Sequence, residues 1–188
     1  MNGIEETRGD LAGSGRRFGI VASRFNQRLG EALIAGAADC LRRHGVAAGD
    51  VLLVTVPGAW EIPQALAALA SAHEAGRGVP GRPLDALIAL GVVIRGETPH
   101  FDYLARECTA GIARAAERHG LPVAYGVLTC DTTEQAAERA GGKAGNKGWE
   151  AALAALEMAD LFARLRAPSA PRSRQAARAP RAPRAPRA

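Results

Sequence analysis

Four short apolar runs recur along the chain, and each is followed by a segment with the spacing of an amphipathic helix. Runs that are apolar throughout, without an alternating polar face, are typical of parallel strands that are buried on both sides. The pattern therefore predicts four main parallel strands. They are FGIVAS at residues 18–23, VLLVTV at 51–56, DALIALGVVI at 85–94 and PVAYGVLT at 122–129.

The segments after these runs predict helices. Leu33, Ala37 and Leu41 share one face of the first helix, and Gly45 ends it. Strands that alternate with helices favour a parallel sheet with right-handed crossovers and helices on both faces. We predict an α/β fold, a three-layer α/β/α sandwich around a four-stranded parallel sheet. Its helices are expected at residues 30–44, 62–74, 102–119, 133–140 and 147–166.

The composition changes at both ends of this patterned region. Residues 1–16 are polar and contain several glycines, which is typical of a mobile segment. Residues 167–188 are mostly Ala, Pro and Arg, and they end in the repeat ARAPRAPRAPRA. Proline at every third position forbids a helix and favours an extended, polyproline-like chain. We therefore expect one folded domain over residues 17–166, followed by a disordered Arg/Pro/Ala-rich tail.

The tail also explains the basic charge of the chain. The formal net charge is +5 at pH 7, and removing the six arginines of the acid-free tail leaves −1 for residues 1–166. The folded region therefore shows no electrostatic sign of a nucleic-acid surface. We expect nucleic-acid binding to be weak and confined to the tail. A tail that only improves solubility is the alternative.

The cysteines and the ends of the chain indicate the compartment. Cys40, Cys108 and Cys130 are far apart and lack CxxC spacing, which argues against a disulfide framework or a zinc site. The chain has no apolar run of about 18 residues and no visible secretory signal, so we expect a cytoplasmic protein without a membrane partner. The glycine motifs of dinucleotide and P-loop sites are also missing. We expect no metal and no cofactor.

Aromatic and polar residues follow the predicted strands, at the edge of the sheet where such folds bind ligands. Phe25 follows the first strand, and Trp60 and Glu61 follow the second. Each has a structural interpretation, because Phe25 can simply pack and Glu61 can stabilise a helix N-terminus. Arg139, after the fourth strand, can likewise belong to a solvated helix face. Only the combination of the loops indicates a site.

The loop after the third strand combines an anion-binding feature with a proton-transfer group. Gly96, Glu97 and Thr98 precede a predicted helix, where unpaired backbone N–H groups and the helix dipole favour a phosphate. Arg139 can bind the same phosphate through two nitrogens. His100 follows closely, and histidine side chains titrate near neutral pH. Taken alone, His100 would more often be a structural or solvent-facing histidine. The combination with an anion site favours proton transfer by His100 beside a phosphorylated substrate.

Five blocks of the chain resemble, in order and spacing, those of the lumazine synthase family, the 6,7-dimethyl-8-ribityllumazine synthases of riboflavin biosynthesis. The resemblance runs from about residue 17 to residue 166. It implies a flavodoxin-like sandwich, which agrees with the pattern of strands and helices. The blocks are FGIVASRFN, VPGAWEIP, GVVIRGETPHFDY, GVLTCDTTEQAAERAG and KAGNKGWEAA.

The resemblance implies a reaction that needs no metal or organic cofactor. In it, 5-amino-6-(D-ribitylamino)uracil condenses with 3,4-dihydroxy-2-butanone 4-phosphate. An imine forms, phosphate is eliminated, and the ring closes to 6,7-dimethyl-8-ribityllumazine with loss of water. The alternative is a non-enzymatic flavin or lumazine binder, or a shell-forming protein, with the same fold.

The resemblance also implies a role for each matching position. His100 is expected to transfer protons, Phe25 to stack on the pyrimidine ring, and Glu61 to accept hydrogen bonds from the ribityl hydroxyls. Trp60 and Tyr125 stand where Phe is usual in the family. The residues expected around the aminouracil and its ribityl chain are Phe25, Asn26, Ala59, Trp60, Glu61, Val93, Ile94, Tyr125 and Lys147. Those expected around the butanone phosphate are Gly96, Glu97, Thr98 and Arg139.

The resemblance finally implies a homo-oligomer. In the family the active site lies between adjacent protomers of a pentamer, and Tyr125 matches a residue that the neighbouring protomer contributes. Members of the family form pentamers, decamers or sixty-subunit shells. The segment from Arg139 to Lys147 lacks the insertion that often accompanies forms limited to the pentamer, which favours a shell. An association with riboflavin synthase is a further possibility that the family raises.

Overall fold

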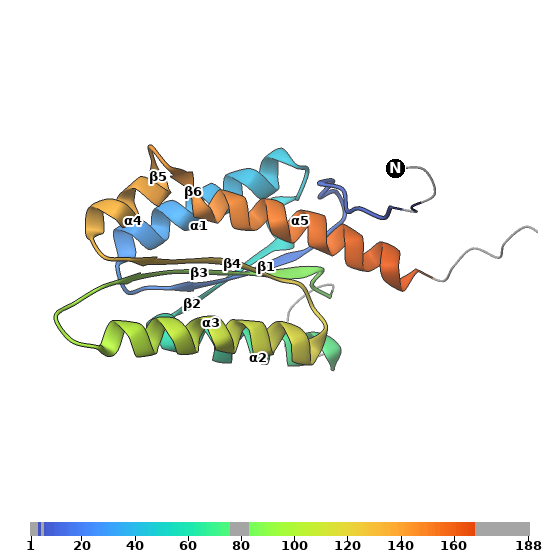
Figure 1. Ribbon diagram of the computed structural model, residues 1–188. Helices are drawn as coiled ribbons and strands as arrows, with labels where there is room; N and C mark the ends of the chain where they lie inside the picture. Colours follow the sequence, from blue (N-terminus) through green and yellow to red (C-terminus); the bar gives the residue numbers. More distant parts are fainter. Residues whose placement is uncertain (1–3, 5, 76–82, 168–188) are drawn as a thin grey trace, which may run out of the picture.

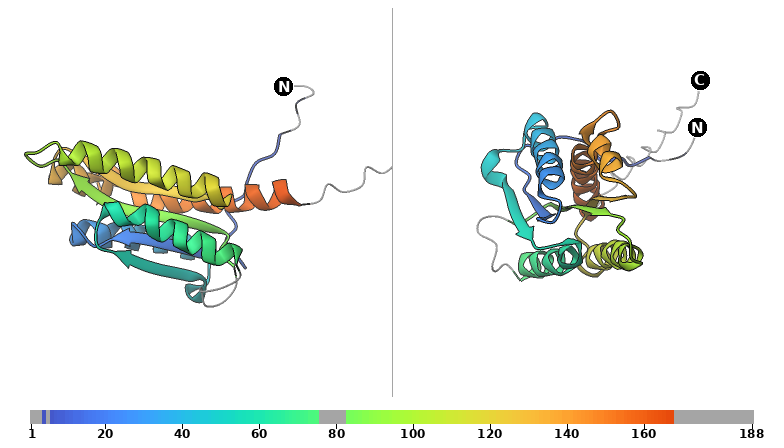
Figure 2. Two further views of the ribbon diagram at one scale, coloured as in Figure 1. Left: turned by 90° about the horizontal axis from the view of Figure 1, so that it is seen from below. Right: turned by 90° about the vertical axis from the view of Figure 1, so that its left-hand side faces the viewer.

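A computed structural model describes residues 4, 6–75 and 83–167. Its main sheet is parallel and has the strand order β2-β1-β3-β4. Helices α1, α4 and α5 cover one face of this sheet, and α2 and α3 cover the other (Figures 1 and 2). The predicted three-layer α/β/α sandwich of the flavodoxin-like type is therefore confirmed. The strands are β1 (Phe18–Ser23), β2 (Val51–Val56), β3 (Ala86–Ile94) and β4 (Val123–Cys130).

The helices agree closely with the sequence pattern. They are α1 (Gln27–Arg43), α2 (Ile62–Glu74), α3 (His100–His119), α4 (Thr133–Arg139) and α5 (Lys147–Arg166), with short 3-10 turns η1 (Ala48–Asp50) and η2 (Ala59–Glu61). The predicted bounds of β1, β2, α2 and α5 are confirmed. Strand β4 begins one residue later than expected, since Pro122 has no N–H to donate, and it extends to Cys130, which pairs with Ile94.

Two helices begin earlier than the sequence indicated. Helix α1 starts at Gln27 rather than residue 30, because Asn26 turns the chain sharply in a left-handed conformation with φ 58°. Helix α3 starts at His100 rather than residue 102, directly after Pro99, whose φ of −62° suits the start of a helix. Both shifts bring helical geometry up to the strand ends.

A short antiparallel hairpin was not predicted. Strands β5 (Ala140–Gly142) and β6 (Gly145–Asn146) pair directly after α4, which therefore ends at Arg139. Gly141 has φ 117° and Gly145 has φ 79°, conformations that glycine adopts without strain. The glycines of AGGKAGN were visible in the sequence, but a strand of two residues leaves no periodic signal.

Two apolar clusters fill the space between the sheet and the helices, one on each face of the sheet. Phe18 and Ile20 of β1 pack toward α1 and α5, whereas Val21 packs toward α2 and α3, as the two-residue period of a strand requires. The central strands β1 and β3 are almost completely buried, as their apolar runs predicted. Strand β2 lies at the edge of the sheet and leaves Leu53 exposed. All three cysteines are buried as free thiols.

The described part of the N-terminal segment contacts α5 beside the sandwich (Figure 1). The backbone N–H of Asp10 donates to Asp160 over 2.9 Å, and a nitrogen of the Arg16 guanidinium lies 2.5 Å from the same carboxylate. Gly13 donates from its backbone to the carbonyl of His44 over 2.8 Å. These contacts join residues that composition indicated to be mobile to the helix layer. The Arg/Pro/Ala-rich tail lies outside the described residues.

The described residues contain neither a membrane-spanning helix nor a cluster of metal ligands. No helix in this part of the chain is long and apolar enough to cross a membrane. No group of three or more His, Cys, Asp or Glu side chains there is arranged to hold a metal ion.

Candidate active site

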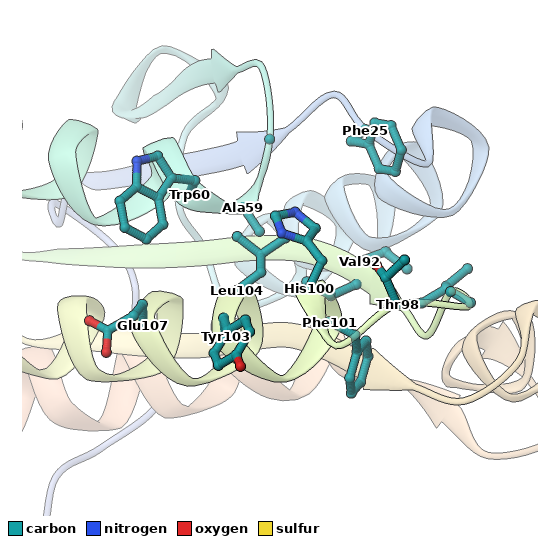
Figure 3. A pocket seen from close by; sticks show the side chains of 14 residues that line it. Phe25, Ala59, Trp60, Val92, Thr98, His100, Phe101, Tyr103, Leu104 and Glu107 are labelled. Atoms are coloured by element: carbon teal, nitrogen blue, oxygen red, sulfur yellow. The ribbon is translucent and has the colours of Figure 1, made fainter.

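An apolar cavity of about 580 Å³ opens at the carboxyl edge of the sheet. Its wall is built from the segments that follow β1 and β2, from the end of β3 with the loop after it, and from the N-terminal part of α3. Figure 3 shows the imidazole of His100 between the side chains of Trp60 and Phe25. The lining residues are Phe25, Gly58, Ala59, Trp60, Val92, Val93, Ile94, Gly96, Thr98, His100, Phe101, Tyr103, Leu104 and Glu107.

Phe25 and Asn26 form the turn after β1. The Phe25 side chain is 71% exposed at the cavity rim, which leaves its ring available to a planar ligand. Asn26 does not line the cavity. Its side-chain Nδ2 donates to the carbonyl oxygen of Val92 over 3.0 Å, and this bond joins the turn to β3. Asn26 therefore fixes the position of Phe25 relative to the central strand.

The segment after β2 enters the cavity through Ala59 and Trp60. Ala59 is buried, whereas the Trp60 indole is 56% exposed. Glu61 lies just behind them, and its Oε2 accepts a hydrogen bond of 2.9 Å from the backbone N–H of Gly58. This contact is the helix-start role that the sequence left open for Glu61. The carboxylate keeps lone pairs for further donors, because one N–H occupies only part of its accepting capacity.

The segment after β3 brings the predicted anion-binding and proton-transfer groups to the same cavity. Val93 and Ile94 line the wall at the end of the strand and Gly96 and Thr98 follow them, whereas Glu97 is not among the lining residues. Within the described residues, the backbone N–H groups of residues 96–98 have no hydrogen-bond partner in the protein. His100 stands at the first position of α3 and is exposed to the cavity.

Helix α3 contributes lining residues that the sequence did not single out. Tyr103, Leu104 and Glu107 follow His100 at intervals of three, four and seven residues, so all four lie on one face. This signal was present, but it depends on the helix starting at His100 rather than two residues later. Phe101 also touches the cavity, and in Figure 3 it extends in the opposite direction from His100.

Besides Asn26, Glu61 and Glu97, three further predicted residues do not line this cavity. Tyr125 lies on β4, and its hydroxyl is 3.0 Å from Oγ1 of Thr109. Burial raises the pKa of the Tyr125 phenol. Arg139 ends α4, where its guanidinium donates to the carbonyl of Gln135 over 2.9 Å. Lys147 begins α5, with Nζ 2.6 Å from Oε2 of Glu150. The geometry of one chain thus separates these groups from Phe25 and His100.

The comparisons with known proteins agree with this geometry. The family model for 6,7-dimethyl-8-ribityllumazine synthase matches residues 15–163. A protein of that name from Aquifex aeolicus (strain VF5) is 54% identical over 158 residues, which are 84% of this chain and 97% of the relative. One from Halorhodospira halophila (strain DSM 244 / SL1) is 55% identical over 151 residues, or 80% of this chain and 91% of the relative.

A third relative with the same name, from Chlorobium phaeobacteroides (strain DSM 266 / SMG 266 / 2430), is 48% identical over 161 residues, which are 85% of this chain and 97% of the relative. The matched region contains the whole sheet, all five helices up to residue 163, and every residue of the cavity wall. The chain belongs to the 6,7-dimethyl-8-ribityllumazine synthase family.

Proposed function

We propose that the chain condenses 5-amino-6-(D-ribitylamino)uracil with 3,4-dihydroxy-2-butanone 4-phosphate, releasing phosphate and water and forming 6,7-dimethyl-8-ribityllumazine. The observation that carries this proposal is the cavity in which two exposed aromatic rings, unpaired backbone donors and His100 meet. Relatives that are 48% to 55% identical carry the name of this synthase. A non-enzymatic binder with the same fold is therefore not favoured.

The aromatic side of the cavity suits the planar uracil. Phe25 and Trp60 offer two large apolar faces near the carboxyl edge of the sheet. Stacking on such faces binds a heteroaromatic ring and keeps its amino group free to react. The carboxylate of Glu61, which is bound on one side by Gly58, supplies an acceptor for the hydroxyls of the ribityl chain.

The loop at residues 96–98 suits the phosphate of the second substrate. Its backbone N–H groups precede the N-terminus of a 20-residue helix, whose dipole favours an anion. Thr98 lines the cavity, and its hydroxyl is a further hydrogen-bond donor for the phosphate. Donors arranged in this way stabilise the negative charge that grows on the phosphate as its bond to carbon breaks.

His100 is the group that moves protons. The amine of the uracil attacks the ketone, and water leaves as the imine forms. A proton is then removed from the carbon next to the imine, which allows phosphate to depart. Elimination leaves an enol, which takes up a proton at its terminal carbon and becomes a new ketone. The second nitrogen attacks this ketone, and loss of water closes the ring. His100 faces the cavity, where it can accept the carbon-bound proton and return it to a departing hydroxyl.

A second copy of the chain completes the site in this proposal. Phe25 and Trp60 are exposed, whereas Tyr125, Arg139 and Lys147 lie outside the cavity. A head-to-tail ring interface joins two different faces of the same chain, so it can bring these two groups of residues together. We propose a homo-oligomer built from pentamers, in which Arg139 of one protomer reaches the phosphate held by its neighbour.

The activity is tested with the two substrates and the purified chain. Lumazine absorbance should rise faster than in the uncatalysed mixture, and free phosphate should appear in step with it. Product formation no faster than in the mixture without protein would contradict the proposal. Measuring the mass of the assembly at the same protein concentration tests the oligomer separately.

A further inference from the structure

Arg95 joins three segments of the chain next to the cavity. Its Nε donates to Oδ1 of Asp131 over 2.9 Å, at the end of β4. Its two terminal nitrogens donate to the two carboxylate oxygens of Asp102 over 3.1 and 3.0 Å, in the first turn of α3. The guanidinium carbon also lies 4.2 Å from the centre of the Phe101 ring. One planar side chain therefore binds two carboxylates and stacks on an aromatic ring.

The Arg95 side chain holds the turn that carries His100 without touching the cavity. Asp102 is two residues after His100, and Phe101 lies between them on the side turned away from His100 in Figure 3. The backbone N–H of Arg95 donates to the carbonyl of Cys130 over 2.9 Å, so Arg95 itself is fixed to the sheet. The N-terminal turn of α3 is thus connected directly to the carboxyl ends of β3 and β4.

The loop between Arg95 and His100 has little else to hold it. A side chain added at Gly96 would meet no atom within 4 Å, and residues 95–100 are all exposed. Within the described residues, the backbone hydrogen bond that bridges this turn runs from Asp102 to the carbonyl of Pro99, over 3.0 Å. Phe101 and Leu104 pack against the apolar cluster between the sheet and the helices α2 and α3, and the contacts of Arg95 add the polar support that holds the turn carrying His100.

The hydrogen bond from Arg95 to Asp131 is followed by further hydrogen bonds that lead to Arg139. The backbone N–H of Asp131 donates to the side-chain oxygen of Gln135 over 3.0 Å. The carbonyl of Gln135 in turn accepts from the Arg139 guanidinium over 2.9 Å. A continuous series of contacts therefore runs from the first turn of α3, through Arg95, to the end of α4.

The exposure of these groups argues against a role in stability alone. The side chains of Arg95, Asp102 and Asp131 are 42%, 56% and 66% exposed. Ion pairs with this exposure contribute little to the free energy of unfolding. A guanidinium that binds one carboxylate through two nitrogens and a second through Nε still imposes a defined direction on both.

We propose that Arg95 is a positioning residue, which holds the first turn of α3 so that His100 faces the reacting atoms, and which couples this turn to the segment that carries Arg139. The inference rests on the role of His100 in the proposed function. It extends that role to a residue outside the cavity wall.

The decisive comparison is between Arg95→Met and Arg43→Met. Arg43 resembles Arg95, because its Nε lies 2.9 Å from Oδ2 of Asp39 and its guanidinium carbon lies 5.8 Å from the centre of the Trp149 ring. It is located at the end of α1, away from the cavity wall. Both changes remove one exposed ion-pair residue and keep an apolar stem, so they are expected to lower Tm by less than about 3 °C.

Arg95→Met is expected to lower kcat about tenfold, with little change in KM for the aminouracil, because Arg95 is not among the residues that line the cavity. Its kcat should also depend on pH differently from that of the wild type, since His100 would occupy several orientations. Arg43→Met should leave kcat unchanged. Arg95→Lys should not restore kcat, since one ammonium group cannot reproduce the planar guanidinium that donates to Asp102 and Asp131 together. Adding Asp102→Asn to Arg95→Met should cause no further loss.

Hydrogen–deuterium exchange without substrates separates this inference from the proposed function. Backbone amides of residues 96–101 should exchange faster in Arg95→Met than in the wild type, and those of α1 and α5 should not. Unchanged exchange in residues 96–101 overturns the inference, even for a fully active wild type. Unchanged kcat in Arg95→Met also overturns it, as does an equal loss of kcat in Arg43→Met. A wild type that forms no product contradicts the proposed function, whereas the exchange result still decides whether Arg95 holds the turn.

Discussion

The side-chain amide of Asn26 donates a 3.0 Å hydrogen bond to the carbonyl oxygen of Val92, so the turn after β1 is joined to the central strand β3. Asn26 has φ 58° and is the one non-glycine residue with positive φ in the part of the chain that the structure describes. Asparagine tolerates this conformation better than most residues do. Asn26 therefore supplies both the conformation of the turn that presents Phe25 and one of its hydrogen bonds, beside the bond of 3.1 Å from the Phe25 N–H to the carbonyl of Pro57.

Asn26→Ala is expected to destabilise the fold by about 2 kcal/mol, because alanine disfavours the left-handed conformation and leaves the Val92 carbonyl without its donor. Asn26→Gly should cost only about 1 kcal/mol, because glycine accepts the conformation and only the hydrogen bond is lost. Urea unfolding of the wild type, Asn26→Ala and Asn26→Gly at equal protein concentration measures the three free energies of unfolding. A stability of Asn26→Ala equal to that of the wild type would contradict this interpretation.

The sequence predicted the sheet well because its central strands are buried on both faces. Continuous apolar runs such as Phe18–Ser23 have no other favourable place in a protein of this size. The short hairpin of β5 and β6 and the left-handed Asn26 could not be predicted, since each depends on one or two residues and on contacts made across the fold. The start of α3 lies two residues before the predicted one for a local reason, because Pro99 sets a φ of −62° that suits a helix start but adds nothing to the apolar periodicity.

The candidate site was predictable in part. The residues that follow β1, β2 and β3 meet in one cavity because parallel strands end at the same edge, and that edge is visible in the sequence. Tyr125 and Arg139 lie outside the cavity of one chain. The periodicity of the sequence does not indicate this placement, because the separation of Tyr125 and Arg139 from His100 is a property of the tertiary fold.

His100→Ala is expected to lower kcat by about 10-fold to 100-fold, with a smaller change in KM for either substrate. The imidazole borders the cavity but belongs to an exposed helix start, so its removal should leave the fold intact. Steady-state rates measured by lumazine absorbance test this expectation. His100→Gln serves as a matched variant, because it keeps a polar side chain but cannot exchange a proton near neutral pH.

Co-expression of His100→Ala and Arg139→Ala chains tests whether the site lies between protomers. Each variant alone is expected to be weakly active. In a ring with head-to-tail interfaces, random mixing places an intact His100 opposite an intact Arg139 at about a quarter of the interfaces. The mixed assembly should therefore recover about a quarter of the wild-type rate.

The control for this experiment is His100→Ala mixed with the double variant, which contains no intact His100 and should show no recovery. If the mixture of the two single variants has only the mean rate of its parents, Arg139 does not act across an interface with His100.

Gly148 is expected to tolerate no side chain. It lies in the first turn of α5, and an added Cβ would collide with the backbone carbonyl of Leu33 in α1. Backbone atoms in two packed helices cannot move independently, so Gly148→Ala should destabilise the fold by about 3 kcal/mol. Gly49→Ala is the matched control, because no atom lies within 4 Å of a Cβ at that position. Equal unfolding midpoints for the two variants would contradict the predicted close approach of α1 and α5.

The contact between Arg95 and Asp102 has a defined dependence on pH. Hydrogen bonds from Arg95 lower the pKa of the Asp102 carboxyl below its ordinary value of 3.8, and the charges of Arg95 and Arg106 act in the same direction. For a carboxyl whose pKa is lower in the folded state, the stabilisation is complete above the unfolded-state pKa and is lost as pH falls through the folded-state pKa. The contact should therefore be intact from about pH 5 to pH 8 and weaken below about pH 4.

Asp102→Asn reports this dependence. The difference in Tm between the wild type and Asp102→Asn is expected to be constant from about pH 5 to pH 8 and to shrink below about pH 4, where the wild-type carboxyl is progressively protonated. In an Arg95→Met background the same substitution should change Tm less from about pH 5 to pH 8, because the main cause of the pKa shift has been removed. A Tm difference that grew as the pH fell below 4 would mean that the protonated carboxyl, rather than the ion pair with Arg95, stabilises the first turn of α3.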